Sequence, residues 1–393
     1  MSKEIVILDG ARTPFGEFCG SLKDVSATDL GVVASKEAIQ RSQVKPDQIN
    51  HVVFGNALQT SADAIYLARH VGLKSGLPIS TPAMTINRLC GSGLQAMVSG
   101  AQLLLLDEAD FVLAGGAENM SQAPHVIRGG RWGLDLGKGQ LEDTLWSSLT
   151  DPYCGCSMAI TAESLAEKYK ISRQEQDEYA HRSQKQAGLA WQKCWIKEEI
   201  APVEIKNRKG ESILVEKDEH MRETSLENLA KLKPYFRKDG FVTAGNASGI
   251  CDGAAAVVLT TKEKAEKSGL KYLGKILAWD YAGVDPSIMG IGPVYAIQKV
   301  LKKTGLKLEQ IDLLEINEAF AAQYLAVEKE LGLDRNKVNV NGGAIALGHP
   351  LAASGARLSL TLLYEMRRRK TKYGVASLCI GGGQGIAAIF ERE

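Results

Sequence analysis

The sequence lacks a charge excess of either sign and has no long hydrophobic run. Lys and Arg number 47 against 46 for Asp and Glu, which leaves a formal net charge of +1. No basic arm or stripe stands out from this balance, so a nucleic-acid partner is not expected. The longest apolar run, AQLLLLDEADFVLAGG, is broken by acidic residues well short of a membrane span, so a membrane partner is not expected either.

The cysteines lack the arrangement of a disulfide framework or a metal site. There are seven in 393 residues, an odd and scattered set that favours free thiols in a reducing compartment. Cys154 and Cys156 in YCGCS lack the C-x-x-C spacing and have no partner pair, so no metal is expected. The N-terminal MSKEIVILDG enters a strand-like run without a signal-peptide pattern. We therefore expect a cytoplasmic protein.

Apolar β-branched runs such as HVVFGNAL alternate with helix-like stretches such as SGLQAMVSGAQLLLLD. This alternation predicts an α/β layer fold with a mostly buried sheet. Three landmarks then recur in order: strand and Asn (VVFGNALQ, LLEINEAF), a turn that feeds a helix (RLCGSGLQAM, LGHPLAASGARL), and strand and glycines (FVLAGGAENM, ASLCIGGGQG). The recurrence indicates two similar α/β halves that face each other.

The segment between these halves differs in texture and is rich in Trp, Lys and Glu. Ser172 and Glu175 have the capping-box spacing of a helix start, and APVEIKNRKGESILVEK predicts two strands around a Lys-Gly turn. We expect three parts: an N-terminal half over 1–120, an inserted loop domain over 121–249, and a C-terminal half over 250–393, with one strand or helix of the N-terminal half near 250–270.

Cys90 stands between a strand-like and a helix-like run in NRLCGSGLQAM. A thiol at a helix N-terminus faces unpaired N–H groups and the positive end of the helix dipole, which favour the reactive thiolate. Gly91 and Gly93 permit a sharp turn and a close approach of substrate. A small buried cysteine in a tight turn explains the same pattern equally well.

Three further residues could carry chemistry. His349 in GGAIALGHP is the best candidate for a general base, because the ordinary pKa of histidine is near neutral, although a lone histidine is more often structural. Cys379 precedes three glycines whose N–H groups could form an oxyanion hole, or which simply pack closely. Asn317 in EINEAF could hold a water, donate a hydrogen bond, or cap the following helix.

The blocks NRLCGSGLQA, NEAFA, GGAIALGHP and CIGGGQG, in this order over nearly the full length, resemble the thiolases. TAGNASGICDGAAA and DPSIMGIGPV also match stretches typical of that family, and SADAIYLARHVGL is most similar to its mitochondrial-type 3-ketoacyl-CoA members. The resemblance implies a five-layered αβαβα core with an inserted loop domain. It also implies coenzyme A as a substrate, no permanently bound cofactor, and a homodimer or homotetramer.

The resemblance gives each candidate a role. Cys90 would be the nucleophile that takes the acyl group as a thioester. His349 would activate Cys90 and, with a water held by Asn317, would stabilise the thioester enolate. Cys379 would be the acid and base at the α-carbon, and the N–H groups of Cys90 and Gly381 would hold the tetrahedral intermediate.

The same resemblance places coenzyme A against the loop domain. Arg222 would meet the nucleotide phosphates. The pantetheine tunnel would be lined by Leu149, Met158, Phe236, Ala244, Ser248, Ala319 and Phe320. An apolar tube with a cation near its mouth suits a thin flexible arm that ends in phosphates.

The implied activity is reversible, CoA-dependent cleavage of 3-oxoacyl-CoA to acyl-CoA and acetyl-CoA in fatty acid metabolism, in the cytoplasm or, in a eukaryote, the mitochondrial matrix. Two positions depart from the family pattern: Ala352 replaces a usual Gly, and Ser157 replaces the His of acetoacetyl-CoA-specific members, which favours a broader substrate range. The alternatives are a dedicated acetyl-CoA acetyltransferase, a decarboxylating condensing enzyme, which would lack Cys379, and a non-catalytic acyl-CoA-binding protein.

Overall fold

The computed structural model describes residues 3–207 and 209–393. Its centre is a ten-stranded mixed sheet, with the order β14-β15-β16-β13-β1-β12-β5-β3-β4 and a short β2 paired to β12. The strands of the first half are β1 (Ile5–Arg12), β2 (Gly16–Glu17), β3 (His51–Gly55), β4 (Ala83–Ile86), β5 (Phe111–Asn119) and β12 (Cys251–Thr261). Those of the second half are β13 (Gly274–Gly283), β14 (Leu313–Ile316), β15 (Tyr373–Ile380) and β16 (Gln384–Glu391).

The two halves repeat one topology, which confirms the prediction from the recurring landmarks. In the first half β3 is parallel to β4 and β5, and β12 is antiparallel to β5 and β1. In the second half β14 is parallel to β15, and β16 is antiparallel to β15 and β13. An isolated parallel bridge from Leu314 to Val338 stands where β4 stands in the first half. β1 and β13 pair over a few residues and join the halves.

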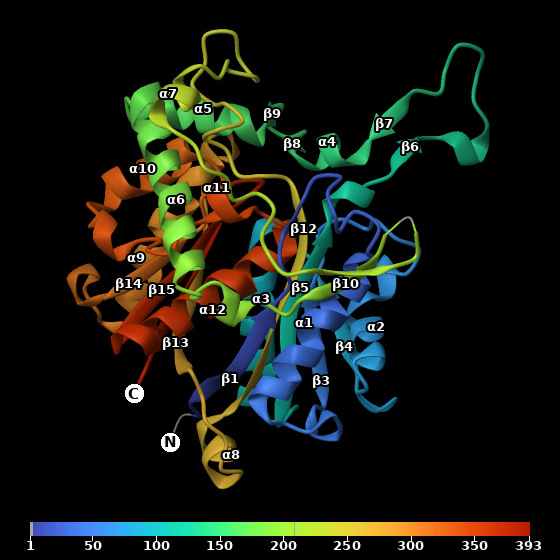
Figure 1. Cartoon of the computed structure of the whole chain (residues 1–393), viewed down its shortest axis with the longest axis vertical. Helices are drawn as coiled ribbons and strands as arrows, with labels where there is room; N and C mark the ends of the chain where they lie inside the picture. The colour runs from blue at the N-terminus through green and yellow to red at the C-terminus, as the bar shows by residue number, and fades with distance from the viewer. Residues whose placement is uncertain (1–2, 208) are drawn as a thin grey trace.

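Helices fill the space between the halves and cover both outer faces, so the layer order is αβαβα as predicted (Figure 1). α1 (Ala27–Ser42) and α2 (Leu67–Lys74) cover the outside of the first half. α3 (Ser92–Leu105) and α12 (Leu351–Arg369) pack on each other in the middle layer, where α12 contacts both β5 and β15. α9 (Gly292–Thr304) covers β13 and β16, with α10 (Ala321–Leu331) beside it; α8 (Lys262–Lys267) follows β12.

The middle segment lies over one end of these layers (Figure 1). Its helices are α4 (Thr144–Ser148), α5 (Met158–Lys168), α6 (Arg173–Gln192) and α7 (Leu226–Ala230). Its strands form three hairpins: β6 (His125–Ile127) with β7 (Leu141–Asp143), β8 (Thr150–Asp151) with β9 (Cys156–Ser157), and β10 (Val203–Lys206) with β11 (Ser212–Val215). The predicted capping box of Ser172 and Glu175 begins α6, and β10–β11 is the predicted hairpin.

The buried pattern of the central elements follows from this layering. β5 is buried along its whole length because helices cover both of its faces, which explains its continuous apolar run. α12 is buried on every side from Leu351 to Met366, because it lies between the two halves of the sheet. In the part of the chain that the structure describes, no helix combines the length and apolarity that a membrane crossing requires.

Two glycines allow α3 and α12 to cross in close contact. A Cβ at Gly93 of α3 would lie 2.6 Å from the carbonyl oxygen of Ala352, and a Cβ at Gly355 of α12 would overlap the backbone nitrogen of Leu94. Both Cβ atoms would lie closer to the backbone of the other helix than real side-chain contacts do. The crossing therefore requires the absence of a side chain on each helix.

Replacement of Gly355 by Ala should destabilise the protein by about 1–3 kcal/mol, the usual cost of overpacking a core. Gly188→Ala in α6 is the matched control, because nothing lies within 4 Å of a Cβ at that position. There the helix propensity of Ala should leave stability unchanged or raise it by up to about 1 kcal/mol. Urea unfolding measures both, and equal responses would contradict the close crossing.

Candidate active site

Cys90 occupies a sharp turn between β4 and α3. The turn is the 3₁₀ helix η3 (Leu89–Gly91), and Leu89 has a left-handed backbone with φ 46°. Asn87 Oδ1 accepts the Leu89 N–H at 2.8 Å, and Ser92 Oγ donates to the Leu89 carbonyl at 2.7 Å. These bonds hold an uncommon conformation of the kind found at functional sites. The predicted strand-turn-helix setting of Cys90 is thus confirmed.

The Cys90 thiol is half-buried, and the backbone N–H groups of Cys90 itself and of Gly381 lie close enough to lower its pKa. Burial nevertheless raises the pKa of Cys90 to about 11, because desolvation outweighs both N–H groups and the nearby Glu118 carboxylate acts in the same direction. The N–H groups at the turn favour the thiolate, as expected from the sequence, but burial has the larger effect on the pKa. The Cys90 thiol is therefore neutral near pH 7, with two backbone N–H groups beside it.

His349 lies buried between two polar partners. Its Nε2 is 3.2 Å from Asn317 Nδ2, and its Nδ1 is 2.6 Å from Ser354 Oγ. Burial, with a smaller contribution from the Arg357 cation, lowers the pKa of His349 to about 3. The imidazole is therefore neutral near pH 7.

The Ser354 hydroxyl determines which imidazole nitrogen carries the proton. Ser354 Oγ donates its only hydrogen to the carbonyl of Pro350 at 2.9 Å. It can therefore only accept from His349, which places the proton on Nδ1 and the basic lone pair on Nε2. Sequence reasoning missed Ser354, although it stands five residues after His349 at the start of the helix-like run.

Asn317 follows β14, and its backbone N–H donates to the Ser377 carbonyl at 2.9 Å. α10 begins at Ala321 with Phe320 at the N-cap position, so Asn317 does not cap that helix. Its Oδ1 is buried and has no hydrogen-bond partner among the described residues. The NH₂ group of the Asn317 amide therefore contacts His349, and its carbonyl oxygen is available for a ligand or a water.

Cys379 lies buried in β15, in a small apolar cluster with Met289 and Ala319. The pKa of Cys379 is raised by burial and by the neighbouring Cys90 sulfur. The two thiols are therefore close enough that a charge on one raises the pKa of the other. Gly381 follows two residues later, and its backbone N–H lies close to the Cys90 sulfur. The structure thus brings Cys90, Cys379 and Gly381 together, and His349 with Asn317.

A cavity of about 330 Å³ opens onto Cys90 and His349. Among the predicted tunnel residues, those that line it are Leu149, Met158, Phe236, Ser248, Ala319 and Phe320. Sequence reasoning missed several of the remaining apolar walls: Phe18, Trp146, Met289 and Leu351. The Trp146 ring is stacked on Phe236 with ring centroids 6.3 Å apart, which makes part of the wall flat and rigid.

Arg222 and Ala244 do not line that cavity. Arg222 Nη2 donates to the Ala244 carbonyl at 2.9 Å, so these two predicted residues contact each other. Arg222 instead lines a second cavity of about 450 Å³, together with Lys185 and Lys217. This second cavity has three cationic side chains and one carboxylate, Glu223, on a wall of mixed polarity, whereas the first cavity is mostly apolar and contains Cys90 and His349.

Glu118 is a buried carboxylate that sequence reasoning also missed. It accepts the backbone N–H groups of Ala57 at 3.1 Å, Leu58 at 2.9 Å and Ala352 at 3.1 Å. Burial raises its pKa to about 7. Glu118 thereby ties the loop after β3 to the start of α12, where Ala352 takes part through its backbone N–H. An acidic residue in the apolar strand FVLAGGAEN was the available signal.

These groups define a site for covalent acyl transfer. A thiol nucleophile, a neutral imidazole with its lone pair on Nε2, two N–H groups aimed at the sulfur and a second thiol are the components that such a reaction needs. The apolar cavity admits a long, thin substrate to that point. The class of protein that fold and site define is therefore a cysteine-dependent acyltransferase.

Comparisons with known proteins agree with this class. The family models "Thiolase, N-terminal domain" and "Thiolase, C-terminal domain" match residues 5–263 and 270–392. The chain is 54% identical to the human mitochondrial 3-ketoacyl-CoA thiolase over 98% of both chains, and 48% identical to an acetyl-CoA acetyltransferase of Syntrophomonas wolfei over 100% of both. A crystal structure of the human enzyme in complex with CoA superposes with a TM-score of 0.96 at 52% identity, and the match covers 100% of this chain and 98% of that one. The chain belongs to the thiolase family.

Ser354→Ala should slow alkylation of Cys90 by about 10- to 100-fold, because the variant no longer holds the His349 tautomer that acts as base and general-base catalysis is worth that much or more. Ser359→Ala is the matched control. Ser359 is equally buried in α12 and makes the same kind of bond, from its hydroxyl to the Gly355 carbonyl at 2.9 Å, without touching a histidine.

The rate of Cys90 alkylation by iodoacetamide, followed by mass spectrometry, measures both variants. The control should react as fast as the wild type. An equal loss of rate in both would mean that Ser354 supports only the helix.

Proposed function

We propose that the protein catalyses reversible thiolysis, in which CoA and a 3-oxoacyl-CoA give an acyl-CoA and acetyl-CoA. The reverse reaction is Claisen condensation, and with two acetyl-CoA molecules it gives acetoacetyl-CoA and CoA. The observation that carries the proposal is the convergence of two thiols, Cys90 and Cys379, with the N–H of Gly381 close to Cys90. His349, which contacts Asn317, lines the same cavity as Cys90. One thiol bonds covalently and the other only moves a proton.

Cleavage begins when Cys90 Sγ attacks the 3-oxo carbon and its proton passes to His349 Nε2. The oxyanion accepts the N–H groups of Cys90 and Gly381, and the C2–C3 bond then breaks to leave an acyl-enzyme and the enolate of acetyl-CoA. The Nε2–H of His349 stabilises this enolate, and Cys379 protonates it at C2. A neutral resting thiol and imidazole suit this sequence, because the proton moves only as the bond forms.

The second half returns the enzyme to its starting state. Incoming CoA gives its thiol proton to the Cys379 thiolate and attacks the thioester carbonyl. The same two N–H groups hold the second tetrahedral intermediate. The acyl-CoA leaves as the Cys90 sulfur departs and recovers its proton from His349, so protons and charges balance.

Coenzyme A is the substrate that the cavities fit. The apolar cavity suits the pantetheine arm, and residues 121–249 act as the loop domain that supplies Leu149, Met158 and Phe236 to its wall. Arg222, in the cationic second cavity, contacts the nucleotide phosphates, with Ala244 beside it. The CoA complex of the human relative supports this assignment. No metal or permanently bound cofactor is assigned a role.

The substrate range includes 3-oxoacyl chains longer than acetoacetyl. Ser157 lines the apolar cavity and also begins α5, where its side chain accepts the Ile160 N–H at 3.4 Å. A hydroxyl that small leaves room that a histidine would occupy. A dedicated acetyl-CoA acetyltransferase is the second candidate, because relatives of both names match the full chain. We place the activity in fatty acid metabolism, in the cytoplasm or in a mitochondrial matrix.

The wild type should consume acetoacetyl-CoA and a longer 3-oxoacyl-CoA in the presence of CoA, as measured by loss of the 3-oxoacyl chromophore. Cys90→Ala should abolish both reactions because no acyl-enzyme can form. Cys379→Ala should still accept an acyl group on Cys90, seen as a mass increase, but should turn over at least about 10²-fold more slowly because proton transfer at C2 is lost.

Other outcomes identify the alternatives. Cleavage of acetoacetyl-CoA alone would mean a dedicated acetyltransferase. Binding of acyl-CoA without cleavage of either substrate would mean a non-catalytic carrier.

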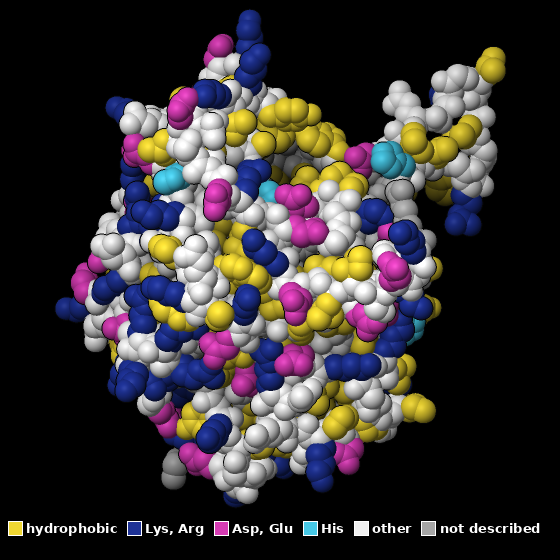
Figure 2. Space-filling model, in the orientation of Figure 1, with side chains coloured by type: hydrophobic (Ala, Val, Ile, Leu, Met, Phe, Trp, Pro, Cys, Tyr) yellow, Lys and Arg dark blue, Asp and Glu magenta, His cyan; other side chains and the backbone are white. Residues whose placement is uncertain are grey.

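The hairpin β6–β7 forms an arm that projects from the body of the protein (Figure 1; Figure 2). Large apolar side chains are exposed along it: Ile127, Trp132, Leu134, Leu136 and Leu141. An exposed apolar surface of this kind marks a contact with another protein. A second copy of this chain is the partner assigned to it, in a homodimer or homotetramer.

Leu136→Glu should lower the mass of the assembly in solution, because the charge would be desolvated in a contact between copies. Leu106→Glu, at the end of α3, is the control: Leu106 is also well exposed but lies off the arm. Light scattering coupled to gel filtration measures the mass. A monomeric wild type, or a Leu136 variant of unchanged mass, would contradict the role of the arm.

A further inference from the structure

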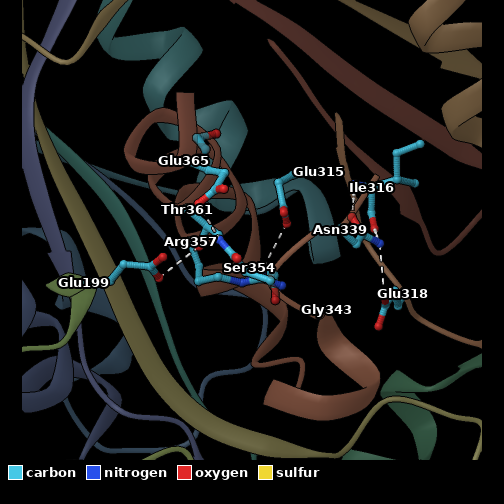
Figure 3. A network of polar contacts seen from close by, with 12 residues as sticks. Glu199, Glu315, Ile316, Glu318, Asn339, Gly343, Ser354, Arg357, Thr361 and Glu365 are labelled. Carbon is cyan, nitrogen blue, oxygen red and sulfur yellow. Dashed lines mark hydrogen bonds and ion pairs between the residues drawn. The ribbon is translucent and has the colours of Figure 1, made fainter. Parts of the chain in front are cut away.

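Glu318, which directly follows Asn317, is a fully buried carboxylate that contacts Asn339 (Figure 3). One oxygen accepts the Tyr179 hydroxyl at 2.7 Å and Asn339 Nδ2 at 3.1 Å. The other accepts the Ser183 hydroxyl at 2.7 Å and the Ile345 N–H at 3.1 Å. Neither the reaction scheme above nor the sequence landmarks gave this side chain a role.

The four donors come from three separate parts of the chain. Tyr179 and Ser183 are one turn apart on α6, in the middle segment. Ile345 belongs to α11 (Ala344–Leu347), which ends one residue before the Gly348–His349 pair. Asn339 stands in the loop between α10 and α11. Glu318 itself directly follows Asn317, so one carboxylate joins α6 to both catalytic loops.

The approach of these segments is close. A Cβ at Gly343 would overlap the Glu318 carboxyl group, so the loop before α11 passes directly over it. The Gly343 N–H donates to Ser183 Oγ at 3.1 Å, and the Ser183 hydroxyl donates a hydrogen bond to Glu318. The Ser183 hydroxyl therefore both donates and accepts. The contact is thus a connected polar network and not a loose packing of side chains.

An amide could not replace the carboxylate. The Asn339 side chain cannot turn over, because its Oδ1 accepts the Ile316 N–H and its Nδ2 donates to the Ile316 carbonyl, both at 2.9 Å. The Ile345 donor is a backbone N–H and cannot reverse either. Each oxygen of Glu318 therefore faces one donor of fixed direction. A glutamine would point its NH₂ group at one of them, whichever way it turned.

We infer that Glu318 is a positioning residue that couples α6 of the middle segment to Asn317 and His349. It holds both catalytic loops in register with that helix, so the imidazole stays in position to take the Cys90 proton and to stabilise the enolate. This inference rests on the proposed thiolase function. The carboxylate touches no substrate and acts only through the two loops.

Glu318→Gln should lower kcat for thiolysis by about 10- to 100-fold, the effect of a displacement near 1 Å at a reacting centre. KM for CoA and for the 3-oxoacyl-CoA should change by less than about threefold, because the residues that line the apolar cavity make no bond to this carboxylate. kcat is expressed per titratable Cys90. Loss of folded protein alone would lower the number of sites and leave kcat per site unchanged.

Tyr179→Phe and Tyr324→Phe form a matched pair that keeps the test decisive if Glu318→Gln does not fold. The two rings are buried and stacked with centroids 4.1 Å apart. The Tyr179 hydroxyl donates to Glu318, whereas the Tyr324 hydroxyl donates to Glu328 at 2.9 Å on its own helix. Tyr179→Phe should lower kcat per site by about 3- to 10-fold, because it removes the hydroxyl that donates to Glu318 and accepts from Asn339 Nδ2 at 3.1 Å while the other donors to the carboxylate remain. Tyr324→Phe should leave kcat per site unchanged.

Alkylation of Cys90 by iodoacetamide provides a second measurement that needs no substrate, because its rate reports whether His349 is in position to take the thiol proton. Tyr179→Phe should slow this alkylation, and Tyr324→Phe should not. A Tyr179 variant with unchanged kcat and unchanged alkylation, or equal effects of the two tyrosine variants, would overturn the inference. If the wild type cleaved no 3-oxoacyl-CoA, the proposed function would fail, and the ratio of alkylation rates would still decide the role of Glu318.

Discussion

The close crossing of α3 and α12 is the constraint on which the site depends. Each helix follows a turn that holds a reactive side chain, Cys90 before α3 and His349 before α12. Gly93 and Gly355 remove the side chains that would keep the two helix starts apart. The same crossing lies between the two halves of the sheet. The packing of the core therefore also sets the positions of Cys90 and His349.

Burial at this crossing shapes the chemistry. It raises the pKa of Cys90 and lowers that of His349, so both side chains are neutral near pH 7. The imidazole has a polar partner on each side, Ser354 at Nδ1 and Asn317 at Nε2. A preorganised, water-poor site of this kind is what stabilisation of an oxyanion requires.

Buried polar side chains behind the reacting groups hold the loops of the site in place. Glu118 ties the start of α12 to the first half, and Glu318 ties the loops that carry Asn317 and His349 to α6. Arg357 and Glu315 form a further buried pair, with N and O atoms 3.4 Å apart. Each joins segments that are distant in the chain, which is why the loops around the cavity are set by tertiary contacts and not by local turn preferences.

Local patterns in the sequence determined much of this protein. The alternation of runs predicted the layers, the recurring landmarks predicted the two halves, and glycines marked the turns at Cys90, His349 and Cys379, because these features depend on neighbours in the chain. The tertiary structure alone decided the protonation of Cys90 and His349, the hydrogen bonds of Ser354 and Glu318, and the separation of Arg222 from the apolar cavity. Those properties arise from burial and from partners that are distant in the chain, which no local pattern records.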